Sequence, residues 1–216
     1  MGRMNTIVVT GVSRGLGRIT AEKFVEEGWN VIGTGRSSRP DDLPESIAYY
    51  RFDASSAEAC AHFWEEISEK HRNVCLVNNA GGYVDGSVVE TSSDDFQKQM
   101  AANYFASVFM TQGLLTRVSR ARVVNVISAG ALGVHAGQSA YGASKAAAMH
   151  FFQALRAEVD PKKYKIINIY PSDIATHGVN EKAIQPVDLA VFIVEQMQRK
   201  DSLYLADVTM YPAQSE

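Results

Sequence analysis

The chain has 216 residues, only two cysteines, no long apolar run and no strong excess of charge. Cys60 and Cys75 lack metal-ligand spacing and do not make a disulfide framework, so both indicate small apolar residues in a reducing compartment. The net charge of -3 disfavours a nucleic-acid surface, which is normally basic. The apolar run Ile7-Val8-Val9 is too short for a signal peptide or a membrane span. We therefore expect a cytoplasmic protein with no metal site, no nucleic-acid partner and no membrane partner.

The sequence also lacks internal repeats, low-complexity segments and any linker long enough to divide it. Hydrophobic residues make up 46% of the chain and charged residues 21%, as in ordinary globular proteins. A chain of this length buries a sizeable core. We therefore expect residues 1–216 to form one compact domain.

Short apolar, β-branched runs alternate with helical patterns along the chain. The strands that we expect cover residues 5–10, 30–35, 48–53, 74–81, 122–128, 165–170 and 202–209. One helix is expected to open with a capping box at Ser55, and a long one is expected to run from Ser92 past Asn103 to Leu115. Right-handed crossovers between such elements predict an α/β fold, a Rossmann-like doubly wound parallel sheet of about seven strands with helices on both faces.

A glycine-rich turn, Gly11-Val12-Ser13-Arg14-Gly15-Leu16-Gly17, joins the first expected strand to a helical pattern. Glycines let the backbone approach a pyrophosphate, and the helix N-terminus supplies free N–H groups and the positive end of a dipole. The alternative, a plain tight turn, needs fewer glycines. The pattern predicts a dinucleotide phosphate site.

The end of the second strand bears on the choice of dinucleotide. An acidic residue there would bind the ribose 2′-hydroxyl of NAD(H), whereas arginine accepts the 2′-phosphate of NADP(H). Here Arg36 follows the strand, and Arg14 lies in the glycine turn. Two guanidinium groups near a phosphate favour NADP(H), unless both are ordinary surface arginines.

Polar residues end or follow several other strands, where ligands collect in open α/β sheets. Asp53 is either such a residue or the start of a turn. Asn78 and Asn79 are expected to pin neighbouring backbone, because buried amides must be hydrogen-bonded. Ser128 ends the fifth strand, and Asn103 is a polar residue inside a helix, where it has either a function or merely a tolerated place.

Tyr141 and Lys145 lie four residues apart and project from one helix face. An ammonium beside a phenol lowers the tyrosine pKa, and such a tyrosine exchanges protons near neutral pH. The alternative is a solvated helix face with a packed ring.

Together these features resemble the short-chain dehydrogenase/reductase family over nearly the whole chain. Thr10-Gly11-x3-Gly15-x-Gly17 resembles its cofactor loop, and Asn78-Asn79-Ala80-Gly81 resembles its motif after the fourth strand. The order and approximate spacing of its catalytic tetrad match Asn103, Ser128, Tyr141 and Lys145.

The resemblance implies that Tyr141 exchanges a proton with the substrate oxygen, that Ser128 binds that oxygen, and that Lys145 holds the ribose and keeps the tyrosine pKa low. Asn103 would position a water in a proton relay. The residues implied to contact the cofactor are Thr10, Gly11, Ser13, Arg14, Gly15, Leu16, Gly17, Arg36, Ser37, Asp53, Ala54, Asn79, Ala80, Gly81, Tyr141, Lys145, Pro171, Ile174 and Thr176.

The chain departs from the family pattern in two places. Ser172 stands where the family usually has glycine, and the loop 177–185 is short for a substrate lid. We expect an open or shallow pocket, whose candidate residues are Tyr83, Val84, Ala129, Leu132, His135 and His177. A ketone, an aldehyde, a quinone and a 3-oxoacyl thioester all remain open as substrates.

The predicted function is therefore an NADP(H)-dependent oxidoreductase that transfers hydride between the nicotinamide and a carbonyl or alcohol. The alternative is a catalytically idle NADP(H)-sensing regulator that acts through a protein partner. The family resemblance also implies a homodimer or homotetramer. Aromatic residues on two helices are compatible with it, unless they belong to the domain's own core: Phe105, Phe109, Phe151 and Phe152.

Overall fold

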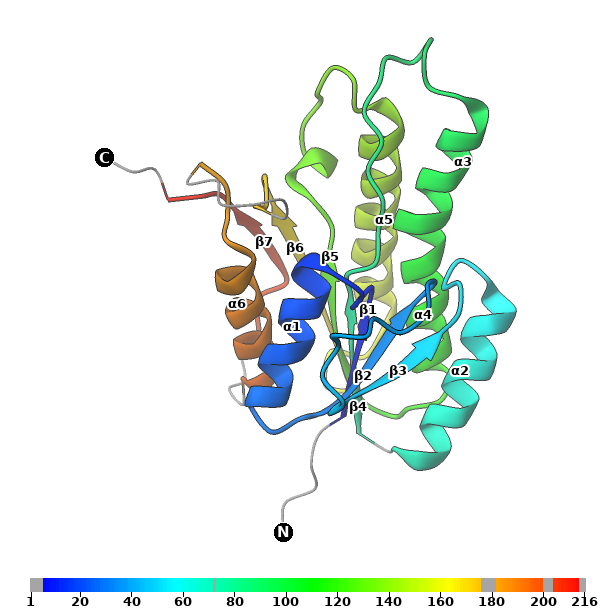
Figure 1. Cartoon of the computed structure of the whole chain (residues 1–216), viewed down its shortest axis with the longest axis vertical. Coiled ribbons are helices and arrows are strands. Elements are labelled where there is room, and N and C mark those ends of the chain that lie inside the picture. Colours follow the sequence, from blue (N-terminus) through cyan, green and yellow to red (C-terminus); the bar gives the residue numbers. More distant parts are fainter. Residues whose placement is uncertain (1–5, 72, 176–181, 200–203, 214–216) are drawn as a thin grey trace.

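The computed structural model describes residues 6–71, 73–175, 182–199 and 204–213. In these residues seven parallel strands form one sheet in the order β3-β2-β1-β4-β5-β6-β7 (Figure 1). The strands are β1 (Thr6–Thr10), β2 (Asn30–Gly35), β3 (Ile47–Arg51), β4 (Val74–Asn78), β5 (Ala121–Val126), β6 (Tyr164–Pro171) and β7 (Asp207–Met210). The predicted Rossmann-like α/β fold is confirmed.

Helices cover both faces of the sheet, which explains why its central strands are apolar at successive positions. Figure 1 shows α1 (Gly15–Glu26) and α6 (Pro186–Gln198) on one side, and α2 (Ala57–Lys70), α4 (Ala106–Leu115) and α5 (Ser139–Glu158) on the other. In β1, Ile7 and Val9 pack towards α1 and α6, whereas Val8 joins the core on the opposite face. All three side chains are fully buried.

The start of α2 differs from the sequence-based expectation. The N-cap of α2 is Ser56, whose hydroxyl accepts a hydrogen bond from the Ala59 N–H at 3.2 Å, so the predicted capping box at Ser55 is wrong by one residue. Ser55 is instead held by Asp53, whose carboxylate accepts hydrogen bonds from the Ser55 N–H at 2.9 Å and its hydroxyl at 2.8 Å. Asp53 therefore makes the turn between β3 and α2.

The long helix expected after Ser92 is not uniform. It consists of α3 (Ser93–Met100), a single π-helical turn at Ala101–Phe105, and α4. Asn103 lies in the π turn. Such turns insert one extra residue into a helix and often occur at functional sites.

The last strand is shorter than predicted. Within the described residues it begins at Asp207 instead of residue 202, and residues 204–206 precede it without strand pairing of their own. Asp207 accepts two hydrogen bonds from Arg156 on α5, one from Tyr170 at 2.7 Å and one from Asn168 at 3.1 Å. This network fixes β7 to the sheet edge.

Candidate active site

The glycine turn between β1 and α1 has the backbone geometry that its glycines permit. Gly11 and Gly15 have positive φ angles of 75° and 61°, which other residues rarely adopt. The N–H of Gly11 donates to the Thr34 carbonyl on β2 at 2.8 Å, which ties the turn to the sheet. Arg14 is the N-cap of α1, and its side chain makes no capping hydrogen bond. The first N–H groups of α1 are therefore available to a phosphate.

Gly17 and Asn79 bring the turn against the end of β4. A Cβ atom at Gly17 would lie 2.2 Å from Asn79 Nδ2 and 2.3 Å from the Gly11 carbonyl oxygen, so only glycine fits. Asn79 Nδ2 donates to the Thr10 carbonyl at 2.9 Å, and the Thr10 hydroxyl accepts from the N–H groups of Asn79 and Ala80 at 3.0 and 2.9 Å. The prediction that Asn79 pins neighbouring backbone is confirmed.

Asn78 points into the sheet core instead of the site. Its amide donates to Thr111 Oγ1 and to Asn125 Oδ1, both at 2.8 Å. Its hydrogen bonds therefore join β4 to β5 and α4 through side chains, so the prediction that Asn78 pins neighbouring backbone is wrong.

The residues after β2 lie on the surface beside the turn. Arg36 and Ser37 are exposed, as is Arg14. Within the described residues neither arginine takes part in a salt bridge, so both guanidinium groups are available to an anionic ligand. Ala54 is buried, whereas Asp53 is exposed and retains one carboxylate oxygen without a hydrogen bond to the described residues.

Lys145 is buried on α5, with only 7% of its surface exposed. Its Nζ donates to the Val126 carbonyl at the end of β5 at 3.2 Å and lies 5.8 Å from the centre of the Tyr141 ring. Burial lowers the pKa of Lys145 to about 8, because the charged form loses hydration. The ammonium group is therefore held beside the tyrosine at a cost in stability.

The pKa of Tyr141 is raised, so the expectation of a lowered value is wrong for the protein as it stands. Burial of the phenol is the main cause, and a hydrogen bond with the Ser128 side chain opposes it. Lys145 does not lower the pKa, since its ammonium is directed to the Val126 carbonyl. The phenol thus stays protonated at neutral pH.

Ser128 lies close to Tyr141 at the carboxyl end of β5. Its hydroxyl accepts a hydrogen bond from the Gly130 N–H at 3.0 Å and so caps the short 3₁₀ turn Ala129–Ala131. A Cβ atom at Gly130 would lie 3.3 Å from Ser128 Oγ and 3.5 Å from the Tyr141 ring. The backbone contact fixes the Ser128 rotamer next to the phenol.

Asn103 joins three segments through its buried amide. Its Nδ2 lies 2.9 Å from the Gly82 carbonyl and from Gln99 Oε1 and 3.0 Å from Ser144 Oγ, and its Oδ1 accepts from the Gly82 N–H at 2.9 Å. A Cβ atom at Gly81 would lie 2.6 Å from Asn103 Oδ1 and 3.5 Å from Lys145 Nζ, so these groups share one corner of the site. Asn103 thus locks the loop after β4 against α5, and its role in a water relay stays a prediction.

The predicted pocket residues around Tyr141 are both polar and apolar, and several of them are exposed. The Tyr83 ring lies edge-on to the Tyr141 ring with a centroid distance of 4.9 Å, and its hydroxyl is 3.3 Å from Gln138 Nε2. Leu132 and His135 are exposed, whereas Val84 is half-buried. Gln138 was missed by sequence reasoning, although it lies three residues before Tyr141.

The segment after β6 carries the last of the predicted cofactor-binding residues. Pro171 is the last residue of β6, and Ile174 pairs with Ile184 in an isolated bridge. The Ser172 N–H donates to the Met210 carbonyl on β7 at 2.9 Å. The Ser172 hydroxyl is buried without a partner among the described residues. Thr176 and His177 lie outside the described residues.

Two searches of the described residues gave negative results. No helix there is both long and apolar enough to span a membrane. No group of three or more His, Cys, Asp or Glu side chains is arranged to hold a metal ion in that part of the chain.

Comparisons with known proteins add to this geometry. A family model described as short chain dehydrogenase matches residues 5–186. The 3-ketodihydrosphingosine reductase of Bacteroides thetaiotaomicron is 32% identical over 182 residues, which cover 82% of this chain and 67% of that protein. The NADP-dependent 3-hydroxy acid dehydrogenase YdfG of Salmonella typhimurium is 27% identical over 195 residues, covering 82% of this chain and 79% of that protein.

Among solved structures, an alcohol dehydrogenase from the archaeon Thermococcus sibiricus, complexed with 5-hydroxy-NADP, superposes with a TM-score of 0.89. The match covers 99% of this chain and 100% of that chain at 18% identity, so it shows the shared fold alone.

Proposed function

Because the chain belongs to the short-chain dehydrogenase/reductase family, we propose that it is an NADP(H)-dependent oxidoreductase that reduces a carbonyl group to an alcohol. The observation that carries the proposal is the grouping of a protonated Tyr141, a hydrogen-bonded Ser128 and a buried Lys145 at the carboxyl edge of the sheet. The activities for which these relatives are named support oxidoreductase chemistry at C=O and CH–OH groups.

The residues of the glycine turn fit a dinucleotide. The positive φ angles of Gly11 and Gly15 and the uncapped start of α1 leave backbone N–H groups for a pyrophosphate, and any side chain at Gly17 would fill this cradle. Arg14 and Arg36 would bind the ribose 2′-phosphate, which supports NADPH over NADH. Asp53 and Asn79 would contact the adenine and the nicotinamide ribose.

Each catalytic side chain has a distinct task in reduction. Bound NADPH supplies the hydride. Tyr141 donates its phenolic proton to the carbonyl oxygen, and its raised pKa keeps that proton in place at neutral pH. Ser128 donates a hydrogen bond to the same oxygen as negative charge develops there. Lys145, whose ammonium lies 5.8 Å from the centre of the Tyr141 ring, would hold the ribose hydroxyls of the bound dinucleotide next to the phenol.

The proposal extends to location and assembly. We propose a cytoplasmic homodimer or homotetramer that associates through α4 and α5. Phe105, the last residue of the π turn, is 41% exposed and stacks on the half-buried Phe109 of α4 at a centroid distance of 5.6 Å, so the Phe105 ring is available for such a contact. Phe152 is fully buried in the chain's own core and does not contribute to such a contact.

The test is NADPH oxidation with a panel that contains a ketone, an aldehyde, a quinone and a 3-oxoacyl thioester. Tyr141→Phe should lower kcat by about 10²- to 10⁴-fold while the affinity for NADPH is unchanged, because only the proton donor is lost. Tyr50→Phe, which removes an exposed phenol hydroxyl bonded to Glu66 on α2, is the matched control. Equal turnover by wild type and Tyr141→Phe would refute the assignment of the proton donor.

Cofactor choice is tested separately. Arg14→Gln/Arg36→Gln should reduce the preference in kcat/KM for NADPH over NADH by about tenfold or more, because charge-assisted contacts to the 2′-phosphate are lost. An unchanged ratio would remove both arginines from the proposed phosphate site.

A further inference from the structure

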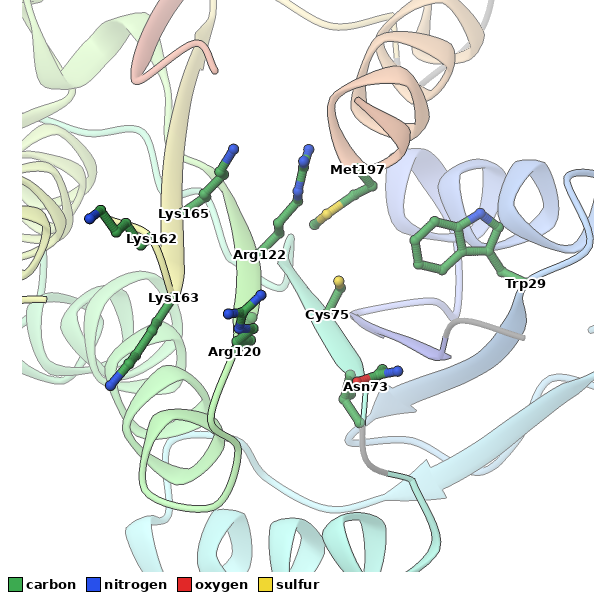
Figure 2. Close-up of a pocket in the computed structure, with 11 residues that line it drawn as sticks. Trp29, Asn73, Cys75, Arg120, Arg122, Lys162, Lys163, Lys165 and Met197 are labelled. Atoms are coloured by element: carbon green, nitrogen blue, oxygen red, sulfur yellow. The ribbon is translucent and has the colours of Figure 1, made fainter. Parts of the chain in front are cut away.

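A cavity lies at the amino ends of the strands, opposite the candidate active site at their carboxyl ends. Its volume is about 270 Å³, and its lining includes residues at the start of three strands: Val74 of β4, Ala121 of β5 and Lys165 of β6. Trp29, just before β2, and Met197, near the end of α6, also line it (Figure 2). Because the candidate active site occupies the carboxyl ends of the strands, this cavity is a separate feature.

Strand register places cationic side chains side by side in this cavity. Arg122 of β5 is paired with Lys165 of β6, so both side chains project from the same face of the sheet. The next residues on that face, Val124 and Ile167, are fully buried against α1 and α6. Arg122 and Lys165 are only half-buried, because the cover provided by α6 ends beside them at Met197 and Gln198.

Two contacts hold these cations in place. The Arg122 guanidinium donates to the Gln196 carbonyl at 2.6 Å and to the Arg199 carbonyl, so it caps the C-terminus of α6. The Lys165 ammonium lies 5.4 Å from the centre of the Tyr204 ring. Figure 2 shows the ends of the Arg122 and Lys165 side chains directed the same way. Arg120 lies nearby, in the segment just before β5.

The charge around the cavity is unbalanced. Five of its eleven lining residues are basic, and none is acidic: the basic ones are Arg120, Arg122, Lys162, Lys163 and Lys165. Within the described residues none of the five forms a salt bridge. The whole chain has 21 basic and 24 acidic residues, so the other 16 basic residues are outnumbered. Figure 2 shows Lys162 and Lys163 directed away from Arg122 and Lys165, so the positive charge that an anion in the cavity would meet comes from Arg122 and Lys165, with Arg120 nearby.

We propose that this cavity binds a small anion that carries phosphate groups. Arg120, Arg122 and Lys165 supply guanidinium and ammonium donors for the phosphate oxygens. The indole of Trp29 and the thioether of Met197 offer an apolar wall for the rest of the ligand. A cavity of about 270 Å³ on a chain with a net charge of -3 suits a small molecule better than a nucleic acid, which needs an extended basic surface.

Inorganic pyrophosphate is the probe, titrated into the full chain at low ionic strength by isothermal titration calorimetry. Arg120→Gln/Lys165→Gln should weaken binding about tenfold or more, because each residue provides a charge-assisted contact. Arg14→Gln/Arg36→Gln is the matched control, because it also removes two positive charges, from the glycine turn and from the residue after β2. Pyrophosphate should still bind the cavity at the amino ends of the strands in this control.

The two tryptophans locate the bound probe. Trp29 lines the cavity, whereas Trp64, on α2, is fully buried in the core and is not among the lining residues. Pyrophosphate should shift the indole N–H signal of Trp29 in an NMR spectrum and leave that of Trp64 unchanged, with Trp29→Phe as the assignment control. Urea unfolding of each variant verifies that it is folded.

Three outcomes would overturn the proposal. The first is unchanged pyrophosphate binding by the folded Arg120→Gln/Lys165→Gln protein. The second is binding that is lost only in Arg14→Gln/Arg36→Gln, with no shift of the Trp29 signal. The third is a failure of pyrophosphate to bind while single-stranded DNA or anionic lipid vesicles bind in a manner that depends on Arg120 and Lys165.

Discussion

Replacement of Lys145 by methionine should stabilise the folded protein at neutral pH and lower its rate of carbonyl reduction. The ammonium group is buried at 7% exposure, and burial lowers its pKa from 10.5 to about 8. A methionine side chain of similar length carries no charge and fills the same space. The protein therefore retains a destabilising group that the proposed chemistry needs beside Tyr141.

The magnitude follows from the pKa difference. Between pH 8 and pH 10.5 the unfolded chain binds a proton at Lys145 that the folded chain has released, so stability due to this residue rises with pH in that window. Below pH 8 the full cost of burying the charge remains, about 3 kcal/mol at pH 7. The variant loses the hydrogen bond to the Val126 carbonyl, worth about 1 kcal/mol. A net gain of about 2 kcal/mol at pH 7 is expected.

Urea unfolding followed by circular dichroism measures this effect. The free energy of unfolding of Lys145→Met minus that of wild type should fall by about 2 kcal/mol between pH 7 and pH 9.5, since all other titrating groups are common to both proteins. Lys162→Met removes an exposed ammonium, and its difference from wild type should stay within about 0.5 kcal/mol. The reasoning is refuted if Lys145→Met is less stable than wild type at pH 7, or if the difference does not change with pH.

Two further variants test the site's construction. Asn103→Ala should lower the free energy of unfolding by about 2–4 kcal/mol, because it leaves Gln99 and the Gly82 backbone without their buried partner, whereas Gln112→Ala on the exposed side of α4 should cost less than about 1 kcal/mol. An equal loss of unfolding free energy in the two variants, measured by urea unfolding, would rule out that Asn103 in the π turn locks the loop after β4 against α5. Gly17→Ala should weaken NADPH binding by about tenfold or more in a fluorescence titration, because its Cβ would lie 2.3 Å from the Gly11 carbonyl oxygen. Gly28→Ala strains a positive φ of 74° outside the turn and should leave that affinity unchanged; a similar loss in both variants would contradict the cradle.

Local sequence patterns were sufficient to predict the order of the elements. Alternation of β-branched runs with helical patterns predicted the parallel sheet. The bounds of some elements were misplaced, as for β3, which stops at Arg51, and α2, whose N-cap is Ser56. The glycine turn was predictable because a positive φ is a local property of Gly11 and Gly15. The same holds for the positions of Ser128, Tyr141 and Lys145, which follow from strand ends and helical spacing.

Properties that depend on surroundings were not predictable in this way. The sequence placed an ammonium near a phenol and so indicated a lowered tyrosine pKa, but burial of Tyr141 outweighs any such effect, and Lys145 is directed to a backbone carbonyl. The π turn at Asn103 depends on partners from Gly82 and Ser144, which are distant along the chain.

The sequence by itself therefore determined the fold class, the glycine turn and the order of the candidate catalytic residues, because each depends on residues close together in the chain. Tertiary structure decided the directions in which the pKa values of Tyr141 and Lys145 shift, because hydration is lost only when other segments cover a side chain. It also decided the basic cavity, because Arg122 and Lys165 become neighbours only through the register of β5 with β6 and the point at which α6 ends.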